Sequence, residues 1–368
     1  MLVPYHAAWI FYPYPWLLHN DQPIPATLAF ITILDRYHMQ LLFLIAGASI
    51  FFSLGKRSVK SFILERLQRL VVPLVFGMLV VVPPCYWITI KQFWSYQGSL
   101  WEFYPLFWKN CLIPFRDGFN SATLWFLWYL VFYTIALSPF LILIRKKVSE
   151  GFLNKLSRPF ENPLTFFALF IPIALVQIQI YALTTITGEN FFVLYYAIFF
   201  IYGFFLFSTP SFDKGLNRSA PASIVIAVIT MTLYMMLVFP TLDKSILGPQ
   251  FWTNFGSERG TAGFILFRTL AGLCTWSFII SLLYLARKFL NFSNRFVSYG
   301  NDLVLPFYII HATPIILIGW WIIHQQWSLL TKYSLITILA FVVVIGICEI
   351  IRRMKVTRFL FGMRLMKR

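Results

Sequence analysis

Four ionisable side chains stand inside or beside long apolar segments of the sequence, and they are the residues best suited to chemistry. His6 lies in the first apolar segment and His311 in a late one, while Arg66 and Arg69 begin another. Ionisable side chains are costly in an apolar environment, so their presence there usually serves a function. An imidazole can act as a general base near neutral pH, and paired guanidinium groups bind phosphate. The four residues indicate a site that combines proton transfer with the binding of an anionic ligand.

Each histidine also has a structural interpretation. His6 lies in the sequence Pro-Tyr-His-Ala-Ala-Trp, and His311 follows Pro-Phe-Tyr-Ile-Ile, about one helical turn after Tyr308. A histidine that is hydrogen-bonded between two packed helices would give the same pattern without any catalytic role. From these residues alone the structural interpretation is the default, and both interpretations stay open at this point.

Arg66 and Arg69 stand in the segment Leu-Glu-Arg-Leu-Gln-Arg-Leu-Val-Val-Pro, where the third apolar segment begins. Their spacing puts both guanidinium groups on one face of a helix, and Pro73, which lacks an N–H group, predicts a kink one turn later. Two such groups at a membrane entrance suit the phosphates of a nucleotide-bearing donor such as coenzyme A. Arginines at this depth also set topology or bind lipid headgroups, and Glu65 can pair with Arg69, so a structural role remains the alternative.

The composition identifies the elements that must position these residues. Of the 368 residues, 59% are hydrophobic and only 12% are charged, and the mean hydropathy is +0.75. A soluble domain carries roughly 25% charged residues, so the surplus apolar surface must face lipid. A helix needs about 20 apolar residues to cross a bilayer. The sequence therefore predicts an all-α polytopic membrane bundle, a single domain over residues 1–368, with about ten transmembrane helices near 1–17, 37–54, 70–90, 122–144, 163–186, 191–208, 221–240, 262–286, 303–324 and 334–351.

Lysine and arginine are concentrated in alternate loops, and the formal net charge is +17. The basic clusters occupy residues 56–69, 145–158, 214–218, 287–295 and 352–368. Membrane proteins keep such loops on the cytoplasmic side. We therefore expect a multi-pass protein of the cell inner (plasma) membrane with both termini in the cytoplasm. The outward loops are then 18–36, 91–121 and 241–261, and this placement of the charge argues against nucleic acid as a partner.

Three further features bear on the interpretation. The first apolar stretch begins abruptly at Met1, and because a full span needs more residues we expect the natural chain to begin about 15–20 residues upstream. The four cysteines are scattered with no CxxC pair, which predicts free thiols and neither a disulfide framework nor a metal site. The many aromatic residues of loop 91–121 can stack on sugar rings, but an interfacial aromatic belt is the favoured interpretation.

Four segments share motifs with a known family. Residues 38–54 (HMQLLFLIAGASIFFSL) are similar to its second helix, and residues 66–73 (RLQRLVVP) are similar to its RxxR-plus-proline element. Residues 124–130 (LWFLWYL) are similar to its LWFL helix, and residues 299–311 to a late helix with a PxYxxH pattern. In this order the chain resembles the acyltransferase 3 superfamily, and within it the glucans biosynthesis protein C-like branch. The resemblance covers most of the chain, and ten helices are also the number found in the family.

The resemblance implies an integral membrane O-acyltransferase. Such an enzyme moves an acyl group, acetyl or succinyl, from cytoplasmic acyl-CoA to a hydroxyl of a glycan or related cell-envelope acceptor. Acyl-CoA would be a donor substrate, and no permanently bound cofactor is expected. By position His6 matches the catalytic histidine of the family's first helix, and Arg66 and Arg69 match its paired arginines, which we expect to bind the donor. His311 is predicted as a second residue of the catalytic site that orients the acceptor.

The chain departs from the family pattern at two places. The arginine that precedes the first-helix histidine would fall before Met1, and Ala122 and Thr123 stand where a histidine often precedes LWFL. A transporter or flippase that moves a glycan or lipid without chemistry is the rival interpretation, and it would favour inverted repeats and broken helices. The enzyme interpretation requires that His6 and the two arginines share one pocket within the membrane.

Overall fold

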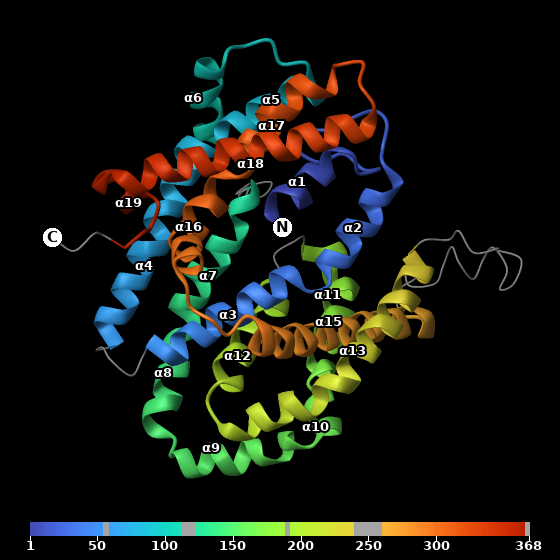
Figure 1. Ribbon diagram of the computed structural model, residues 1–368, viewed down its shortest axis with the longest axis vertical. Helices are drawn as coiled ribbons and strands as arrows, with labels where there is room; N and C mark the ends of the chain where they lie inside the picture. Colours follow the sequence, from blue (N-terminus) through green and yellow to red (C-terminus); the bar gives the residue numbers. More distant parts are fainter. Residues whose placement is uncertain (54–58, 112–121, 188–191, 239–259, 365–368) are drawn as a thin grey trace, which may run out of the picture. The chain divides into compact units, whose positions relative to one another are not determined.

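The computed structural model describes residues 1–53, 59–111, 122–187, 192–238 and 260–364 (Figure 1). Within these ranges every regular element is a helix, which confirms the predicted all-α class. The predicted outer loop 241–261 lies almost wholly outside the described residues, as do Lys56, Arg57 and residues 365–368 of the basic clusters.

The helices follow one another along the chain as α1 (Leu2–Ile10), α2 (Pro25–Asp35), α3 (His38–Ser53), α4 (Val59–Phe76), η1 (Gly77–Val81), α5 (Pro83–Trp94), α6 (Leu100–Cys111), η2 (Ala122–Leu124), α7 (Trp125–Ala136), α8 (Ser138–Lys147), α9 (Glu150–Ser157), η3 (Arg158–Glu161), α10 (Pro163–Phe167), α11 (Phe170–Thr187), α12 (Phe192–Leu206), α13 (Pro210–Val238), α15 (Ala262–Phe289), α16 (Arg295–Ile310), α17 (Ala312–Ile323), α18 (Leu329–Arg353) and α19 (Lys355–Leu360).

Up to eight membrane spans can be counted in the described residues by length and composition. Four are unbent spans, namely Pro25–Ser53, which comprises α2 and α3, and the single helices Pro210–Val238, Ala262–Phe289 and Leu329–Arg353. The other four are pairs of helices joined at a bend, namely Lys60–Val81 with Pro83–Trp94, Trp125–Ala136 with Ser138–Lys147, Glu150–Glu161 with Pro163–Gln179, and Arg295–Ile310 with Ala312–Ile323.

Two of the ten expected spans are shorter than predicted, and one expected loop is partly helical. The expected span 1–17 holds only α1, which ends at Ile10, because Pro13 and Pro15 follow and cannot continue a helix. The expected span 191–208 is the 15-residue helix α12. The predicted loop 18–36 is wrong over its second half, since α2 begins at Pro25, where proline suits a first helical turn, and α2 and α3 together form one candidate span.

The chain forms two compact units, each drawn from separate stretches of sequence. The first unit comprises Met1–Ile31, Ile63–Ile135 and Ser293–Arg368, and the second comprises Thr32–Phe62 and Ala136–Phe292. Because the stretches alternate along the chain, no single cut separates the two units. All four predicted site residues belong to the first unit.

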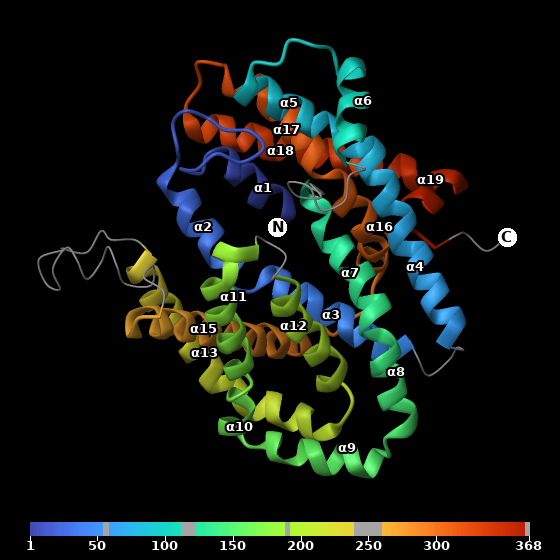
Figure 2. The ribbon, with the colours of Figure 1, turned by 180° about the vertical axis from the view of Figure 1, so that it is seen from behind.

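The second unit is held together by close approaches between helix backbones. α3 packs on α12, and α13 lies beside α15 (Figure 2). At Gly203 of α12 an added Cβ would lie 1.8 Å from the carbonyl oxygen of Leu44, and at Gly47 of α3 it would lie 1.8 Å from that of Phe200. Small residues allow this approach in membranes, where packing replaces the hydrophobic effect between helices. Gly47, the glycine of the segment 38–54, therefore serves helix packing.

In the first unit, α1 packs against α17 and α18. A buried apolar cluster joins the three helices and includes Val3, Ala7, Ile316 and Ala340. The loop that follows α1 folds back, and the backbone N–H of Asn20 donates to the carbonyl of Ile10 at 2.8 Å. Such return contacts satisfy carbonyl groups that the end of a short helix leaves open, so they hold the nine-residue α1 in place.

The span formed by α4 and α5 is broken at Pro83, one helical segment after Pro73, where the sequence predicts a kink. The helix continues through Pro73 to Phe76, and the chain then forms the π-helical turn η1 before it bends by 40° into α5. Pro83 and Pro84 have no N–H groups, so carbonyl groups four residues before them lose their helical donors. Two tandem prolines therefore disturb the helix more than the single one.

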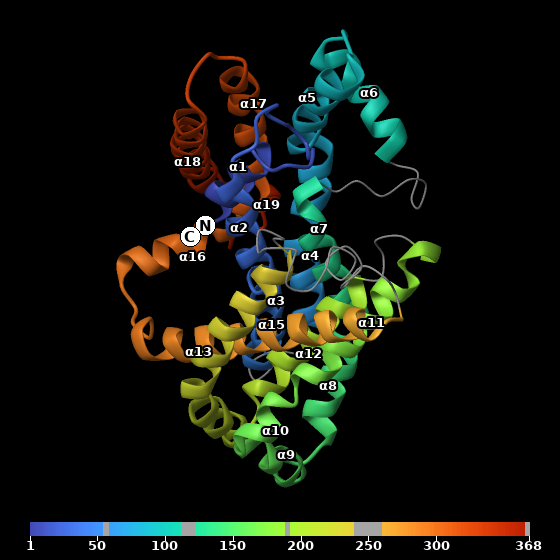
Figure 3. The same cartoon turned by 90° about the vertical axis from the view of Figure 1, so that its right-hand side faces the viewer.

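Aromatic side chains of α6 supply the missing donors. Trp108 donates through Nε1 to the carbonyl of Leu79 at 3.1 Å, and the hydroxyl of Tyr104 donates to the carbonyl of Val80 at 3.1 Å. α6 is placed for this because it folds back beside α5 (Figure 3). Two aromatic residues of the predicted loop 91–121 thus donate hydrogen bonds to the carbonyl groups that the break leaves without helical donors.

We predict that Trp108→Phe lowers stability by about 1–2 kcal/mol, because the ring is kept while a carbonyl of the broken span loses its donor. For a chain of this size the melting temperature should fall by a few degrees, which thermal denaturation of the detergent-purified protein would measure. Trp94→Phe is the matched control, since Trp94 is 71% exposed. Equal melting temperatures for the two variants would contradict the role assigned to Trp108.

Candidate functional site

The two histidines predicted from the sequence lie in direct contact. Nε2 of His311 is 3.2 Å from Nδ1 of His6, and the ring centroids are 4.6 Å apart. His6 projects from α1, and His311 occupies the junction of α16 and α17, where the helices bend by 54°. His311 is completely buried. Residues 305 positions apart are thus brought together.

The hydrogen bonds of the pair determine which nitrogen carries each proton. Nδ1 of His311 lies 2.6 Å from the carbonyl oxygen of Tyr308, and a carbonyl only accepts, so this nitrogen is protonated. In the neutral ring Nε2 of His311 is then an acceptor. Nδ1 of His6 must donate to it, and the same N–H also lies 3.0 Å from the carbonyl of Leu2. This leaves Nε2 of His6 as the nitrogen with a lone pair, the atom that a general base needs.

α16 is fixed where it carries His311. The hydroxyl of Tyr308 donates to the backbone carbonyl of Thr123, at η2 just before the LWFL segment. Pro306 lies inside the same helix, and the bend follows within a few residues. The backbone carbonyl of Thr123 therefore anchors the helix that bears His311.

Aromatic rings of the same segment lie around His6, and none of them was predicted as a site residue from the sequence. The ring of Tyr5 lies 4.9 Å from that of His6, and the ring of Trp16 lies 5.4 Å from it. The ring centroids of Trp9 and Trp16 are 6.1 Å apart, so Trp9 extends this group of rings. The density of Trp and Tyr between residues 5 and 16 was the available signal, but their approach to His6 depends on the return of the loop after α1.

The two arginines reach different partners. Nε of Arg66 donates to Oγ1 of Thr134 on α7 at 3.2 Å, and Nε of Arg69 donates to the carbonyl of Gly362 at 3.1 Å. Both arginines are partly buried. Arg66 is thus engaged with a neighbouring helix, and Arg69 with the segment that follows the last span.

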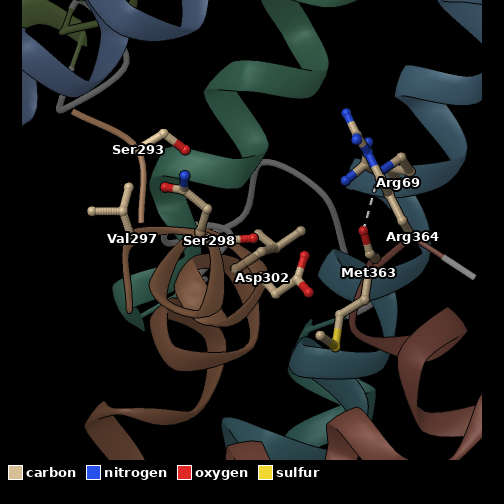
Figure 4. A pocket seen from close by; sticks show the side chains of 10 residues that line it. Arg69, Ser293, Val297, Ser298, Asp302, Met363 and Arg364 are labelled. Carbon is tan, nitrogen blue, oxygen red and sulfur yellow. Dashed lines mark hydrogen bonds between the residues drawn. The ribbon is translucent and has the colours of Figure 1, made fainter. Parts of the chain in front are cut away.

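Arg69 lines a polar cavity of about 420 Å³ (Figure 4). The cavity lies between α4, α16 and the end of the described chain, and its walls are formed by Arg69, Ser293, Val297, Ser298, Asn301, Asp302, Leu305, Gly362, Met363 and Arg364. In Figure 4 Arg69 and Arg364 lie on one side, and Ser293, Val297 and Ser298 lie on the other. Two guanidinium groups make the cavity suitable for an anionic ligand.

The polar cavity and the histidine pair both involve α16, but they lie at different positions along it. Neither histidine nor Arg66 lines this cavity. The expectation that His6 shares one pocket with the two arginines therefore stays a prediction. Asp302 in the cavity wall and His311 are nine positions apart on α16 and its continuation, which corresponds to about 13 Å along a helix axis. A long, linear substrate could reach both places. Among the described residues, no group of three His, Cys, Asp or Glu side chains could hold a metal ion.

Comparison with known proteins supports the motifs seen in the sequence. No curated protein and no solved structure matches the chain significantly. A family model described as an acyltransferase domain matches residues 1–353. The match covers both histidines, both arginines and every candidate span. The matched family is a family of membrane proteins. The chain therefore belongs to the acyltransferase 3 family and is a membrane acyltransferase.

Proposed function

We propose that the protein is an O-acyltransferase of the inner (plasma) membrane that moves an acetyl or succinyl group from cytoplasmic acyl-CoA to a hydroxyl of a glycan or related cell-envelope acceptor, as in the glucans biosynthesis protein C-like branch. Family membership makes the protein a membrane acyltransferase. The choice of donor and acceptor is our proposal. The contact between His6 and His311 carries it, because acyl transfer to a hydroxyl needs a positioned base.

The reaction follows from the proton positions in the pair. Nε2 of His6 takes the proton of the acceptor hydroxyl while the oxygen attacks the thioester carbonyl. The tetrahedral intermediate then collapses, the carbon–sulfur bond breaks, and the same proton passes from His6 to the departing sulfur. The products are an ester and the free thiol of CoA. His311 accepts a hydrogen bond from Nδ1 of His6 throughout and stabilises the transient positive charge.

The surroundings of the pair favour transfer over hydrolysis. Val3, Ala7 and Ala312 belong to the buried apolar cluster beside the two rings. An apolar, water-poor site protects a reactive thioester from hydrolysis and strengthens the hydrogen bonds within it. The acceptor hydroxyl would then be the nucleophile with access to the carbonyl carbon.

Release of the CoA thiol tests the proposal against the transporter interpretation. The full chain, purified in detergent, would be mixed with acetyl-CoA or succinyl-CoA and an oligoglucan, and the free thiol would be followed with a chromogenic reagent. We expect thiol release that depends on the acceptor, together with acylated glycan. Four candidate spans are bent pairs of helices, a feature that is also typical of transporters. If the protein moved glycan or lipid across proteoliposome membranes and left acyl-CoA intact, the transporter interpretation would be correct and our proposal wrong.

His311 is predicted to act through His6. In His311→Gln an amide oxygen can still accept from His6, so we expect kcat to fall by about 10-fold, whereas His311→Leu removes the acceptor and should lower kcat by about 100-fold. The KM for acyl-CoA should stay constant in both. His324→Leu is the matched control, since His324 also contacts a carbonyl, that of Trp320 at 2.6 Å. Equal kcat values for His311→Leu and the control would remove His311 from the mechanism.

A further inference from the structure

One buried arginine makes the hydrogen bonds that hold the conformation of the segment following the last span. Arg358 is only 6% exposed. Its guanidinium donates twice to the backbone carbonyl of Arg364, through Nε at 2.9 Å and Nη2 at 2.6 Å, and once to that of Arg352, through Nη1 at 3.1 Å. We refer to residues 354–364 as the C-terminal tail. This side chain thus links the end of α18 to the end of the tail.

The tail is also docked onto α4. Gly362 has a φ of +66°, and a Cβ at this position would lie 2.5 Å from the carbonyl oxygen of Arg69. Only glycine adopts this conformation and allows this approach without strain. In return the carbonyl of Gly362 accepts the hydrogen bond from Nε of Arg69. The ring of Phe361 is buried against that of Phe76, with centroids 5.2 Å apart.

The docked tail completes the polar cavity. Gly362, Met363 and Arg364 form one wall of it, while the opposite wall comes from α16 (Figure 4). Arg364 is exposed, and no carboxylate in the described part of the chain lies within ion-pair distance of its guanidinium. The family match ends at residue 353, so this wall lies outside the matched region.

We propose that the C-terminal tail is a working part of the donor site, in which Arg364 together with Arg69 binds the phosphate groups of acyl-CoA and Arg358 is the positioning residue that holds Arg364 there. This inference rests on the proposed function. Two guanidinium groups match phosphate oxygens, and Ser298 and Asp302 across the cavity suit the hydroxyl and amino groups of a nucleoside. The linear pantetheine arm would cover the roughly 13 Å along α16 to His311.

The nucleotide assignment is favoured over a lipid headgroup by the link to the histidine pair. A glycerol or ethanolamine headgroup also carries donors for Asp302, but a phospholipid has no thioester to present to His6. Acyl-CoA has both the phosphates for the arginines and a linear arm that would carry its thioester along α16 toward His311. The shared chemistry is a phosphate ester, and the experiment below separates the two sources.

Binding of CoA to the detergent-purified full chain tests the role of Arg364. The affinity of the wild type, Arg364→Ala and Arg353→Ala would be measured by isothermal titration calorimetry for CoA and for pantetheine, which lacks phosphate. We expect Arg364→Ala to weaken CoA binding about tenfold, the loss of one charge-assisted hydrogen bond, and to leave pantetheine binding unchanged. Arg353 is an exposed arginine outside the cavity, so Arg353→Ala should bind both ligands like the wild type.

The role of Arg358 is tested through its coupling to Arg364. Arg358→Met should raise the KM for acyl-CoA about tenfold with kcat unchanged, and the double variant with Arg364→Ala should be no worse than either single variant. A merely structural loss would lower the active fraction and hence kcat. Additive effects of the two substitutions would overturn the positioning role of Arg358.

The remaining outcomes are distinguishable. Unchanged CoA affinity in Arg364→Ala overturns the inference and leaves the proposed function standing. If phosphatidylglycerol stabilises the wild type against heat but not Arg364→Ala, while CoA affinity is equal, the cavity binds a lipid phosphate and the donor assignment is overturned. If the wild type neither binds CoA nor releases its thiol from acyl-CoA, the proposed function fails, and the inference fails with it.

Discussion

Replacing His6 by alanine is expected to lower kcat by about 10²–10⁴-fold, the contribution of a positioned general base. The proton positions of the histidine pair make His6 the acceptor of the substrate proton, since His311 is protonated on the nitrogen that faces the carbonyl of Tyr308. With alanine the only lone pair left in the histidine pair is that of Nε2 of His311, which is completely buried behind the position of the lost ring. The measurement is acceptor-dependent thiol release by variants purified at equal amounts.

His6→Gln separates proton transfer from packing. The amide can still donate to His311 or to the carbonyl of Leu2, but it cannot accept a proton at neutral pH. We expect its kcat to fall as far as that of His6→Ala, while its melting temperature stays closer to that of the wild type. The KM for acyl-CoA should change little, because His6 does not line the cavity that contains Arg69. Normal turnover in His6→Gln would show that the ring has a structural role only.

Gly203→Ala is expected to cause the largest loss of folding stability, about 3 kcal/mol or more. The added methyl group would lie 1.8 Å from the carbonyl oxygen of Leu44 and 3.0 Å from the backbone nitrogen of Ala48. Both neighbours are backbone atoms, so no side-chain rotation relieves the clash, and α3 and α12 must separate. Forced overpacking usually costs about 1–3 kcal/mol, and a contact this short between two backbones belongs at or beyond the upper end.

Gly346→Ala provides the control for this prediction. Gly346 lies in α18, and an added Cβ there would meet nothing within 4 Å. Alanine in a helix is favoured over glycine by about 0.5–1 kcal/mol, so this variant should be as stable as the wild type or slightly more so. The comparison would use thermal denaturation in detergent and the yield of monodisperse protein. Equal melting temperatures for Gly203→Ala and Gly346→Ala would contradict the observed packing of α3 on α12.

The difference between Pro73 and Pro83 shows why the break in the span formed by α4 and α5 could not be located from the sequence. Both residues lack an N–H group, and by local chemistry either could interrupt a helix. The observed break lies at Pro83, where side chains of α6 satisfy the freed carbonyl groups of Leu79 and Val80. That compensation comes from a separate helix, so only the packed structure reveals it.

The arginine pair illustrates the same limit at the site. The spacing of Arg66 and Arg69 correctly places both on one helix, but it cannot tell which neighbours they meet. Arg66 contacts α7, and Arg69 contacts the C-terminal tail. The contribution of Arg364 was invisible for the same reason, because a basic residue near the end of a chain has many ordinary explanations.

By itself the sequence determined that this protein is a helical membrane protein, and it predicted which ionisable residues are candidates for the site. Hydropathy is a local property that adds up along each segment, and an ionisable side chain in such a segment is recognisable wherever the segment packs. Only the tertiary structure decided that His6 meets His311, that Arg69 meets the tail, and where the span of α4 and α5 breaks. These facts depend on contacts between residues far apart in the chain, and no local pattern encodes the partner of such a contact.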